Sequence, residues 1–211
     1  MVAFTYLALA ASVITSVFAS PIASPDAPDF ELSSSNLARR QDYTQNYKTS
    51  GSINFSPRAQ DFVVGKGWNT GSKSRSVTFS GSTSAKSGTV LVSLYGWATG
   101  PLVEYYVQEY SNGQGAAQGQ KMGSFTSDGS EYDIYKHTQV NQPSIQGTTT
   151  FTQYISVRKS GRPNGGTITF ANHVAAWEKH GMNLGTMKYQ TISTEGWGNA
   201  AGSSKYTVSG K

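Results

Sequence analysis

The chain contains no cysteine among its 211 residues. Disulfide bonds and thiolate metal sites are therefore excluded, and packing alone must hold the fold together. The three histidines, His137, His173 and His180, are dispersed along the sequence and form no metal-ligand cluster. We expect neither a bound metal nor a cofactor.

Charge is also scarce, because charged residues make up only 14% of the chain. The chain has 17 Lys and Arg and 12 Asp and Glu. Two of the basic and three of the acidic residues lie in the first 40 positions. Residues 41–211 therefore carry a formal charge of 15 − 9 = +6. The basic residues are scattered singly, without a basic helix or an Arg-rich run, which argues against a nucleic-acid-binding protein. A soluble protein whose positive surface suits acidic material is the better interpretation.

A long apolar run occurs only at the N-terminus. Residues 1–20 (MVAFTYLALAASVITSVFAS) end in small residues and predict a secretory signal peptide, without the usual positive charge at its start. Ser and Thr interrupt the run and polar sequence follows it, which disfavours a membrane anchor. Residues 21–40 lack periodicity and end in Arg39-Arg40, which predicts a propeptide cut at a dibasic site. We therefore expect a secreted, extracellular protein with one domain at 41–211 and no membrane association.

Short stretches of alternating apolar and polar residues recur between Gly-, Ser- and Asn-rich turns. β-Branched and aromatic residues dominate them, a pattern typical of an all-β sandwich or barrel. One segment differs: Phe170, Val174 and Trp177 fall at i, i+4 and i+7, and Gly181 supplies a stop. Residues 170–181 are therefore predicted to form one amphipathic helix on the outside of a sheet, where His173 is expected to be a structural hydrogen-bonding residue. The predicted strands are 76–80, 89–95, 102–110, 149–157, 167–170 and 189–194.

Two acidic residues lie within aromatic strand stretches. Glu104 interrupts PLVEYYV, where alternation places it on the face of Tyr106, and Glu195 ends YQTISTEGW on the face of Tyr189 and Trp197. Burial disfavours a carboxylate unless donors offset the cost, so such groups are rarely kept for stability alone. The pair suggests the two carboxylates of glycoside hydrolysis. The pattern leaves open whether the two faces meet, the alternative being two unrelated surface positions.

Seven runs occur in the order and spacing of a known family, and the similarity covers about residues 51–208. The chain resembles the secreted fungal endo-1,4-β-xylanases of glycoside hydrolase family 11. This resemblance implies a monomer that acts on xylan and xylo-oligosaccharides. It implies a β-jelly roll of two curved antiparallel sheets, shaped like a partly closed hand with a thumb loop, plus one α-helix. The runs are FVVGKGW (62–68), SLYGW with PLVEYYVQEY (93–110), TSDGSEYDIY (126–135), VNQPSIQGTTTFTQYISVR (140–158), ITFANHVAAW (168–177), HGMNLG (180–185) and YQTISTEGW (189–197).

The resemblance also implies roles for single residues. Glu104 matches the nucleophile and Glu195 the acid/base of a retaining mechanism. Asp61 matches a residue that contacts the acid/base, and an Asp at this position implies an acidic pH optimum. Substrate contacts are implied for Tyr95, Tyr106, Pro143, Gln153 and Tyr189.

The chain departs from the family pattern at several positions. The usual first strand, whose Trp stacks on a xylose, has no match in residues 41–56, and Phe55 stands where Trp is common. Gln139 replaces an Arg near the base of the thumb, and Ile155 replaces a Trp. A lost stacking platform would cost about 1–2 kcal/mol of sugar binding and expose a sheet edge. Two functions remain open: an active endo-xylanase, or a xylan-binding or elicitor-like member with weak or lost catalysis.

Overall fold

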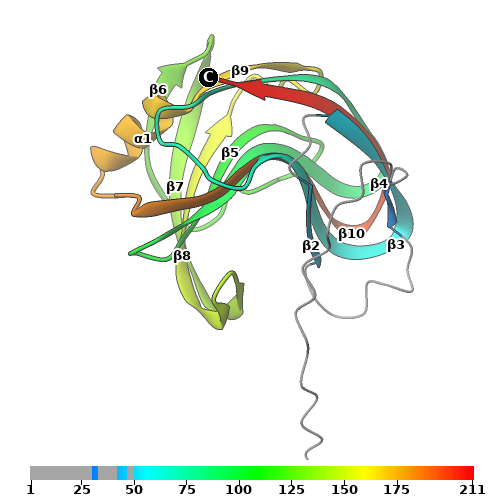
Figure 1. The fold of residues 1–211 in the computed structure, drawn as a ribbon, viewed down its shortest axis with the longest axis horizontal. Helices are drawn as coiled ribbons and strands as arrows, with labels where there is room; N and C mark the ends of the chain where they lie inside the picture. Colours follow the sequence, from blue (N-terminus) through cyan, green and yellow to red (C-terminus); the bar gives the residue numbers. More distant parts are fainter. Residues whose placement is uncertain (1–29, 33–41, 47–49) are drawn as a thin grey trace, which may run out of the picture.

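The computed structural model describes residues 30–32, 42–46 and 50–211, and its strands form one hydrogen-bonded network (Figure 1). The strand order is β1-β3-β10-β4-β5-β8-β7-β6, with β2 also paired to β3 and β9 to β4. The predicted all-β fold with a single helix is confirmed. The elements are β1 (Phe30–Leu32), β2 (Asp42–Asn46), β3 (Ser50–Trp68), β4 (Ser76–Thr99), β5 (Val103–Ser111), β6 (Gln120–Ser127), β7 (Ser130–Ser144), β8 (Gly147–Arg158), β9 (Gly165–Thr169), α1 (Phe170–Glu178) and β10 (Thr186–Gly210).

The long strands β3, β4 and β10 bend, so that each contributes to both layers of the hand-shaped fold (Figure 1). Residues 76–80 of β4 pair with β9, whereas residues 91–98 pair with β5. Two separate strands were predicted here because the polar stretch 81–88 resembles a turn. It is strand instead, since β10 pairs with β4 on both sides of this stretch and through residues 81–87. Most pairs are antiparallel, and β5 pairs with β8 in parallel.

The outer edge of β3 carries two short strands. Strand β1 pairs in parallel with residues 53–55, and β2 pairs in parallel with residues 62–66. Strand β2 lies in the expected catalytic domain, whereas β1 falls within the expected propeptide. Both expected cleavage positions, near residues 20 and 40, lie outside the described residues. The signal peptide and the propeptide therefore stay predictions, and so does the loss of the stacking Trp, which the structure does not test.

Helix α1 packs its apolar face against the sheet. Phe170, Val174 and Trp177 are buried, as the spacing predicted, and the ring of Phe170 lies 5.2 Å from that of Tyr105. Gly181 has a φ of +67°, which suits a residue that ends a helix. Within the described part of the chain, no helix has the length and apolar character needed to cross a bilayer.

His173 lies inside this core, between the rings of Phe125 and Tyr132 at centroid distances of 5.0 and 4.7 Å. Neither of its ring nitrogens finds a hydrogen-bond partner among the described residues, so the expected hydrogen-bonding role is wrong there. Burial lowers the pKa of His173 to about 3, with a smaller opposing effect from Asp128. His173 is therefore neutral in the folded protein at any pH above this value.

We expect this neutral histidine to make the fold acid-sensitive. The unfolded chain takes up a proton near pH 6.5 that the folded chain takes up only near pH 3, so stability falls as the pH drops through this window. Over the whole window, the wild type should lose on the order of 5 kcal/mol of unfolding free energy. Urea unfolding of wild type and His173→Leu across the window measures it. The variant should show a flatter dependence on pH, and parallel curves would refute the assignment.

Candidate active site

The concave face of the sheet holds a cleft of about 330 Å³. Its walls come from β4, β5, β7, β8 and β10 and from the segment between β5 and β6. Apolar, aromatic and amide side chains dominate the lining, and no Lys or Arg with a described side chain belongs to it, which suits an uncharged ligand with apolar faces and hydroxyl edges. The lining residues are Leu91, Glu104, Tyr106, Ala116, Gln118, Gln139, Gln142, Pro143, Phe151, Gln153, Ile155, Glu195 and Trp197.

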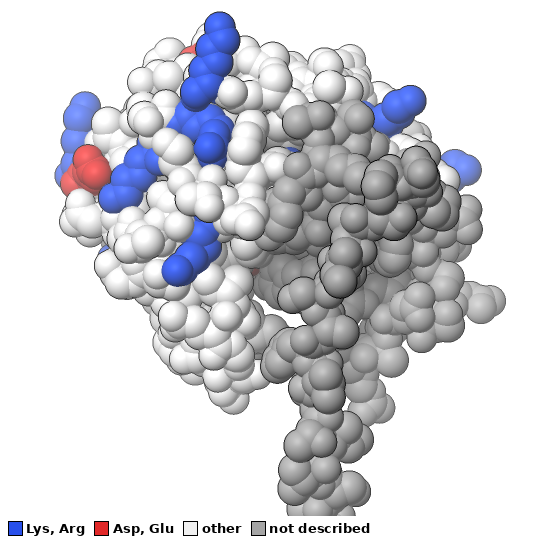
Figure 2. All heavy atoms as spheres, viewed as in Figure 1, with Lys and Arg blue, Asp and Glu red and all other residues white. Residues whose placement is uncertain are grey.

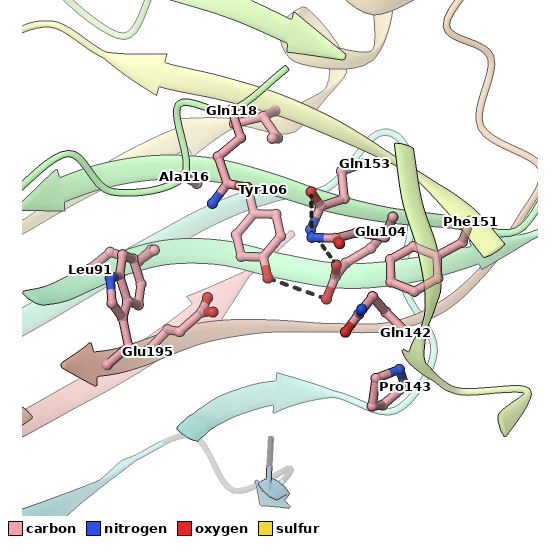
Figure 3. A pocket seen from close by; sticks show the side chains of 13 residues that line it. Leu91, Glu104, Tyr106, Ala116, Gln118, Gln142, Pro143, Phe151, Gln153 and Glu195 are labelled. Atoms are coloured by element: carbon pink, nitrogen blue, oxygen red, sulfur yellow. Dashed lines mark hydrogen bonds between the residues drawn. The ribbon is translucent and has the colours of Figure 1, made fainter. Parts of the chain in front are cut away.

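Glu104 lies on β5 in this cleft and is only 2% exposed (Figure 3). Its Oε1 accepts hydrogen bonds from the hydroxyls of Tyr95, at 2.7 Å, and Tyr106, at 3.2 Å. Its Oε2 accepts a hydrogen bond of 2.7 Å from Nε2 of Gln153. These three donors offset the cost of burying the charge and fix the direction in which the carboxylate points.

A second layer of contacts orients two of these donors. The indole nitrogen of Trp97 donates to the Tyr95 hydroxyl at 2.9 Å, which leaves the Tyr95 proton available for Glu104. The Gln139 amide donates to Oε1 of Gln153 at 3.4 Å, which favours the amide orientation that turns Nε2 toward the carboxylate. Gln139, a departure from the family pattern, thus acts on Glu104 through Gln153.

Glu195 enters the same cleft from β10 and is 8% exposed. Strand β4 runs between β5 and β10, with Trp97 opposite Glu104 and Leu91 opposite Glu195. Because the sheet curves, both carboxylates line one cavity although they come from different strands. Figure 3 shows their carboxyl ends turned toward the same space, beside Tyr106.

The predicted substrate contacts fall into two groups. Tyr106, Pro143 and Gln153 line the cleft, whereas Tyr95 is fully buried behind it. Tyr189 also lies outside the lining, with its ring 5.9 Å from that of Tyr95. A strand pattern shows which face a residue shares, but not how deep in the wall it lies.

Asp61 lies on β3, opposite Trp197 of β10. Val63, two residues further along β3, is opposite Glu195, so the backbone of Asp61 lies close to the strand position of Glu195. The Asp61 side chain is outside the described residues. Its contact with Glu195 stays a prediction.

The hairpin of β7 and β8 forms the thumb, and a bulge shapes its inner side. The register shifts by one residue between Gln139 and Gln142, where Asn141 has a φ of +54°. Residues three apart on a regular strand face opposite sides, but this bulge lets Gln139 and Gln142 line the same cleft. Asn is among the few residues that adopt this left-handed conformation readily.

Glu109 is a fully buried acid that the sequence did not single out. It forms an ion pair with Arg162 and accepts a 2.8 Å hydrogen bond from the Tyr132 hydroxyl. Burial raises the pKa of Glu109, and the Arg162 guanidinium partly counteracts this. Its place outside the cleft and its fixed partners indicate a structural role. Its pairing with Arg162 and its position outside the cleft distinguish it from Glu104.

No group of three His, Cys, Asp or Glu is placed to hold a metal within the described residues. The chemistry that the cleft can perform follows from its two carboxylates. Glu104, held by three donors, is suited to act as an anionic nucleophile, and Glu195 can carry the proton for a leaving group. Such a pair is the machinery of glycoside hydrolysis.

Comparison with known proteins points to one family. A family model described as Glycosyl hydrolases family 11 matches residues 32–207. Endo-1,4-beta-xylanase 1 of Hypocrea jecorina is 46% identical over 232 residues, with 99% of this chain and 100% of the relative covered. Ethylene-inducing xylanase 2 of Botryotinia fuckeliana is 43% identical over 226 residues, with the same coverage. A structure from a comparison of two major endo-1,4-β-xylanases of Trichoderma reesei matches with a TM-score of 0.72 and 49% identity, covering 80% of this chain and 98% of that one.

Proposed function

The chain belongs to glycosyl hydrolase family 11, and from this premise we propose that it hydrolyses internal β-1,4-xylosidic bonds of xylan with retention of configuration. The observation that carries the proposal is the pair of carboxylates, Glu104 and Glu195, in one cleft lined by amides and aromatic rings. Such a lining fits an uncharged sugar chain. We infer that the protein acts as a monomer.

In the first step, Glu195 donates its proton to the departing glycosidic oxygen while Glu104 attacks the anomeric carbon. The bond to the leaving sugar breaks and a covalent xylosyl-enzyme forms. In the second step, Glu195 takes a proton from a water molecule, which attacks the same carbon and releases Glu104. Two inversions give net retention. This mechanism requires carboxyl groups about 5–5.5 Å apart rather than the wider spacing of inverting enzymes.

Glu195 has opposite protonation states in the two steps, and Glu104 controls the change. A negative Glu104 in the free enzyme favours the protonated form of Glu195. Once Glu104 is esterified, this charge is gone, so Glu195 ionises more readily and serves as the base. Closure of the thumb over the sugar would exclude water, with the Pro143 carbonyl accepting a hydrogen bond from a sugar hydroxyl.

Hydrolysis of xylan by the purified chain from residue 41 onward tests the activity. We expect reducing ends to appear on unsubstituted xylan and not on cellulose, with a ladder of xylo-oligosaccharides as early products. Release of xylose alone would contradict endo cleavage. No release at all would overturn the proposed activity.

The second candidate is a protein whose effect on plants does not depend on turnover. The observation that favours it is the name of the Botryotinia fuckeliana relative, an ethylene-inducing xylanase. Ethylene release from leaf tissue treated with wild type or with Glu104→Gln separates the two functions. Equal release would establish the second activity, and release by wild type alone would reject it.

We infer that Asp61 sets an acidic pH optimum. A carboxyl group that shares a proton with Glu195 couples the two titrations, so that the pair as a whole loses its first proton at lower pH than Glu195 would beside a neutral neighbour. We infer that this first proton is the one that catalysis needs. Asp61→Asn should therefore raise the pH optimum of xylan hydrolysis by about one unit. The pH profile of kcat/KM for both proteins measures this, and an unchanged optimum would contradict the role.

We also infer that the protein is exported, with residues 1–20 removed as a signal peptide and residues 21–40 as a propeptide. Expression of the full chain in a fungal host should yield secreted protein that begins at Gln41. N-terminal sequencing reads the start directly, and Arg40→Gln should block the second cut. Secreted protein beginning near Pro21 in the wild type would contradict the propeptide.

A further inference from the structure

Few acidic side chains act as free charges on the described surface. Most are buried, held by hydrogen bonds or paired with lysine. Among the acids whose side chains the structure describes, Glu178 is the one exposed acid outside an ion pair. The other acids with described side chains are Glu104 and Glu195 in the cleft, Glu109 paired with Arg162, Asp128 bound to Thr169, Glu131 paired with Lys159, and Asp133 paired with Lys121. The free charges among the described side chains are thus almost all positive.

Part of this positive charge is gathered at one place. Lys73 and Arg75 lie in the segment between β3 and β4, and the backbone NH of Gly71 in this segment donates to the carbonyl of Lys188 on β10. Figure 2 shows Lys and Arg side chains over this segment, the start of β10 and the C-terminus, with little acidic surface among them. We call Lys73, Arg75 and Lys188 the basic corner. None of the three lines the cleft.

Arg75 is fixed in a geometry that suits an anion. Its guanidinium lies over the ring of Trp68, 4.3 Å from the centroid, and its Nη1 donates to Oε1 of Gln190 at 2.6 Å. Its Nε and Nη2 groups make no hydrogen bond within the described part of the chain. A guanidinium held on an aromatic ring with free N–H groups can bind a carboxylate at little entropic cost.

The two lysines supply the charge around this anchor. The Lys73 ammonium is tied to the carbonyl of Leu184, and Lys188 is exposed. No described carboxylate forms an ion pair with any of the three cations. A group of cations without neighbouring anions attracts anionic polymers, so the basic corner can bind such a polymer.

We propose that the basic corner binds carboxylate-bearing polysaccharide, that is, chains containing uronic acid, outside the catalytic cleft. Among the described side chains, the cleft has no cation with which to bind such groups, whereas the corner has three. The choice of a polysaccharide over other polyanions rests on the proposed function, but the binding itself does not require catalysis. The corner holds the enzyme to acidic regions of the wall polymer while the cleft acts on neutral stretches.

Binding of the full chain to immobilised polygalacturonate, compared with immobilised unsubstituted xylan, tests the proposal. The test variant is Lys73→Gln/Lys188→Gln, which leaves the stacked Arg75 in place. The matched control is Lys86→Gln/Lys205→Gln, which removes the same charge from two exposed lysines elsewhere on β4 and β10. Both variants should hydrolyse neutral xylo-oligosaccharides like wild type, so failure of the corner and failure of the proposed activity are distinguishable.

We expect the corner variant to bind polygalacturonate roughly tenfold more weakly than wild type, and the control to bind about as well as wild type. Raising NaCl from about 0.01 to 0.15 M shortens the screening length from about 30 to 8 Å and should weaken wild-type binding. Equal losses in both variants would assign binding to net charge and overturn the corner. Absent wild-type binding, or equally tight binding to single-stranded DNA, would overturn the polysaccharide assignment.

Discussion

Glu104→Gln is expected to lower kcat/KM on xylan by on the order of 10⁴-fold or more. The amide is nearly isosteric with the carboxylate but lacks the anionic oxygen that must attack the anomeric carbon, so no xylosyl-enzyme forms. Initial rates of reducing-sugar release measure the loss. Binding of xylo-oligosaccharides should persist, because Gln153 and Tyr106 remain in the cleft.

The stability of the Glu104→Gln variant shows whether its loss of activity comes from unfolding. The Tyr95 and Tyr106 hydroxyls can rotate to accept from the new amide, and removing a buried charge ends its desolvation cost. We therefore expect urea unfolding close to that of wild type. A stable variant that keeps substantial activity would show that Glu104 is not the nucleophile.

Glu195→Ala should lower kcat on xylan by about 10²–10⁴-fold, because both the proton donor of the first step and the base of the second are lost. The loss depends on the leaving group. An aryl xylobioside with an acidic phenol needs no protonation, so its first step should remain fast while hydrolysis of the xylosyl-enzyme becomes slow. Stopped-flow measurement should then show a burst of phenol followed by slow turnover.

Azide gives this variant a sharper test. It is a small anion that attacks without a general base and fits the space that the truncated side chain leaves. Added azide should restore turnover of the aryl substrate and yield a β-xylosyl azide of retained configuration. An α-xylosyl azide would instead assign the nucleophile to Glu195. No rescue would remove the general-base role.

Local sequence signals predicted much of the fold. The spacing of Phe170, Val174 and Trp177 predicted a helix that the structure shows with this face buried. Alternation also placed Glu104 and Glu195 on the correct strands. Both signals are short-range, because helix and strand periods need only neighbouring residues.

Local periodicity could not predict the features that depend on contacts between residues distant in the sequence. The polar stretch 81–88 resembles a turn, and only its pairing with β10 makes β4 one continuous strand. Whether Glu104 and Glu195 share a cleft depends on the curvature of the sheet, which no periodicity records. The burial of Glu109 depends on Arg162, which is 53 residues away in the sequence. The neutral state of His173 follows from the rings packed around it.

We propose that Glu104 and Glu195 hydrolyse xylan by double displacement. Proton NMR of the products in the first minutes of xylo-oligosaccharide hydrolysis tests it most directly, because the new reducing end appears as one anomer before mutarotation mixes them. Double displacement gives the β-anomer first, with the α-anomer growing later. Initial appearance of the α-anomer would mean a single displacement by water, and Glu104 would then not be the nucleophile.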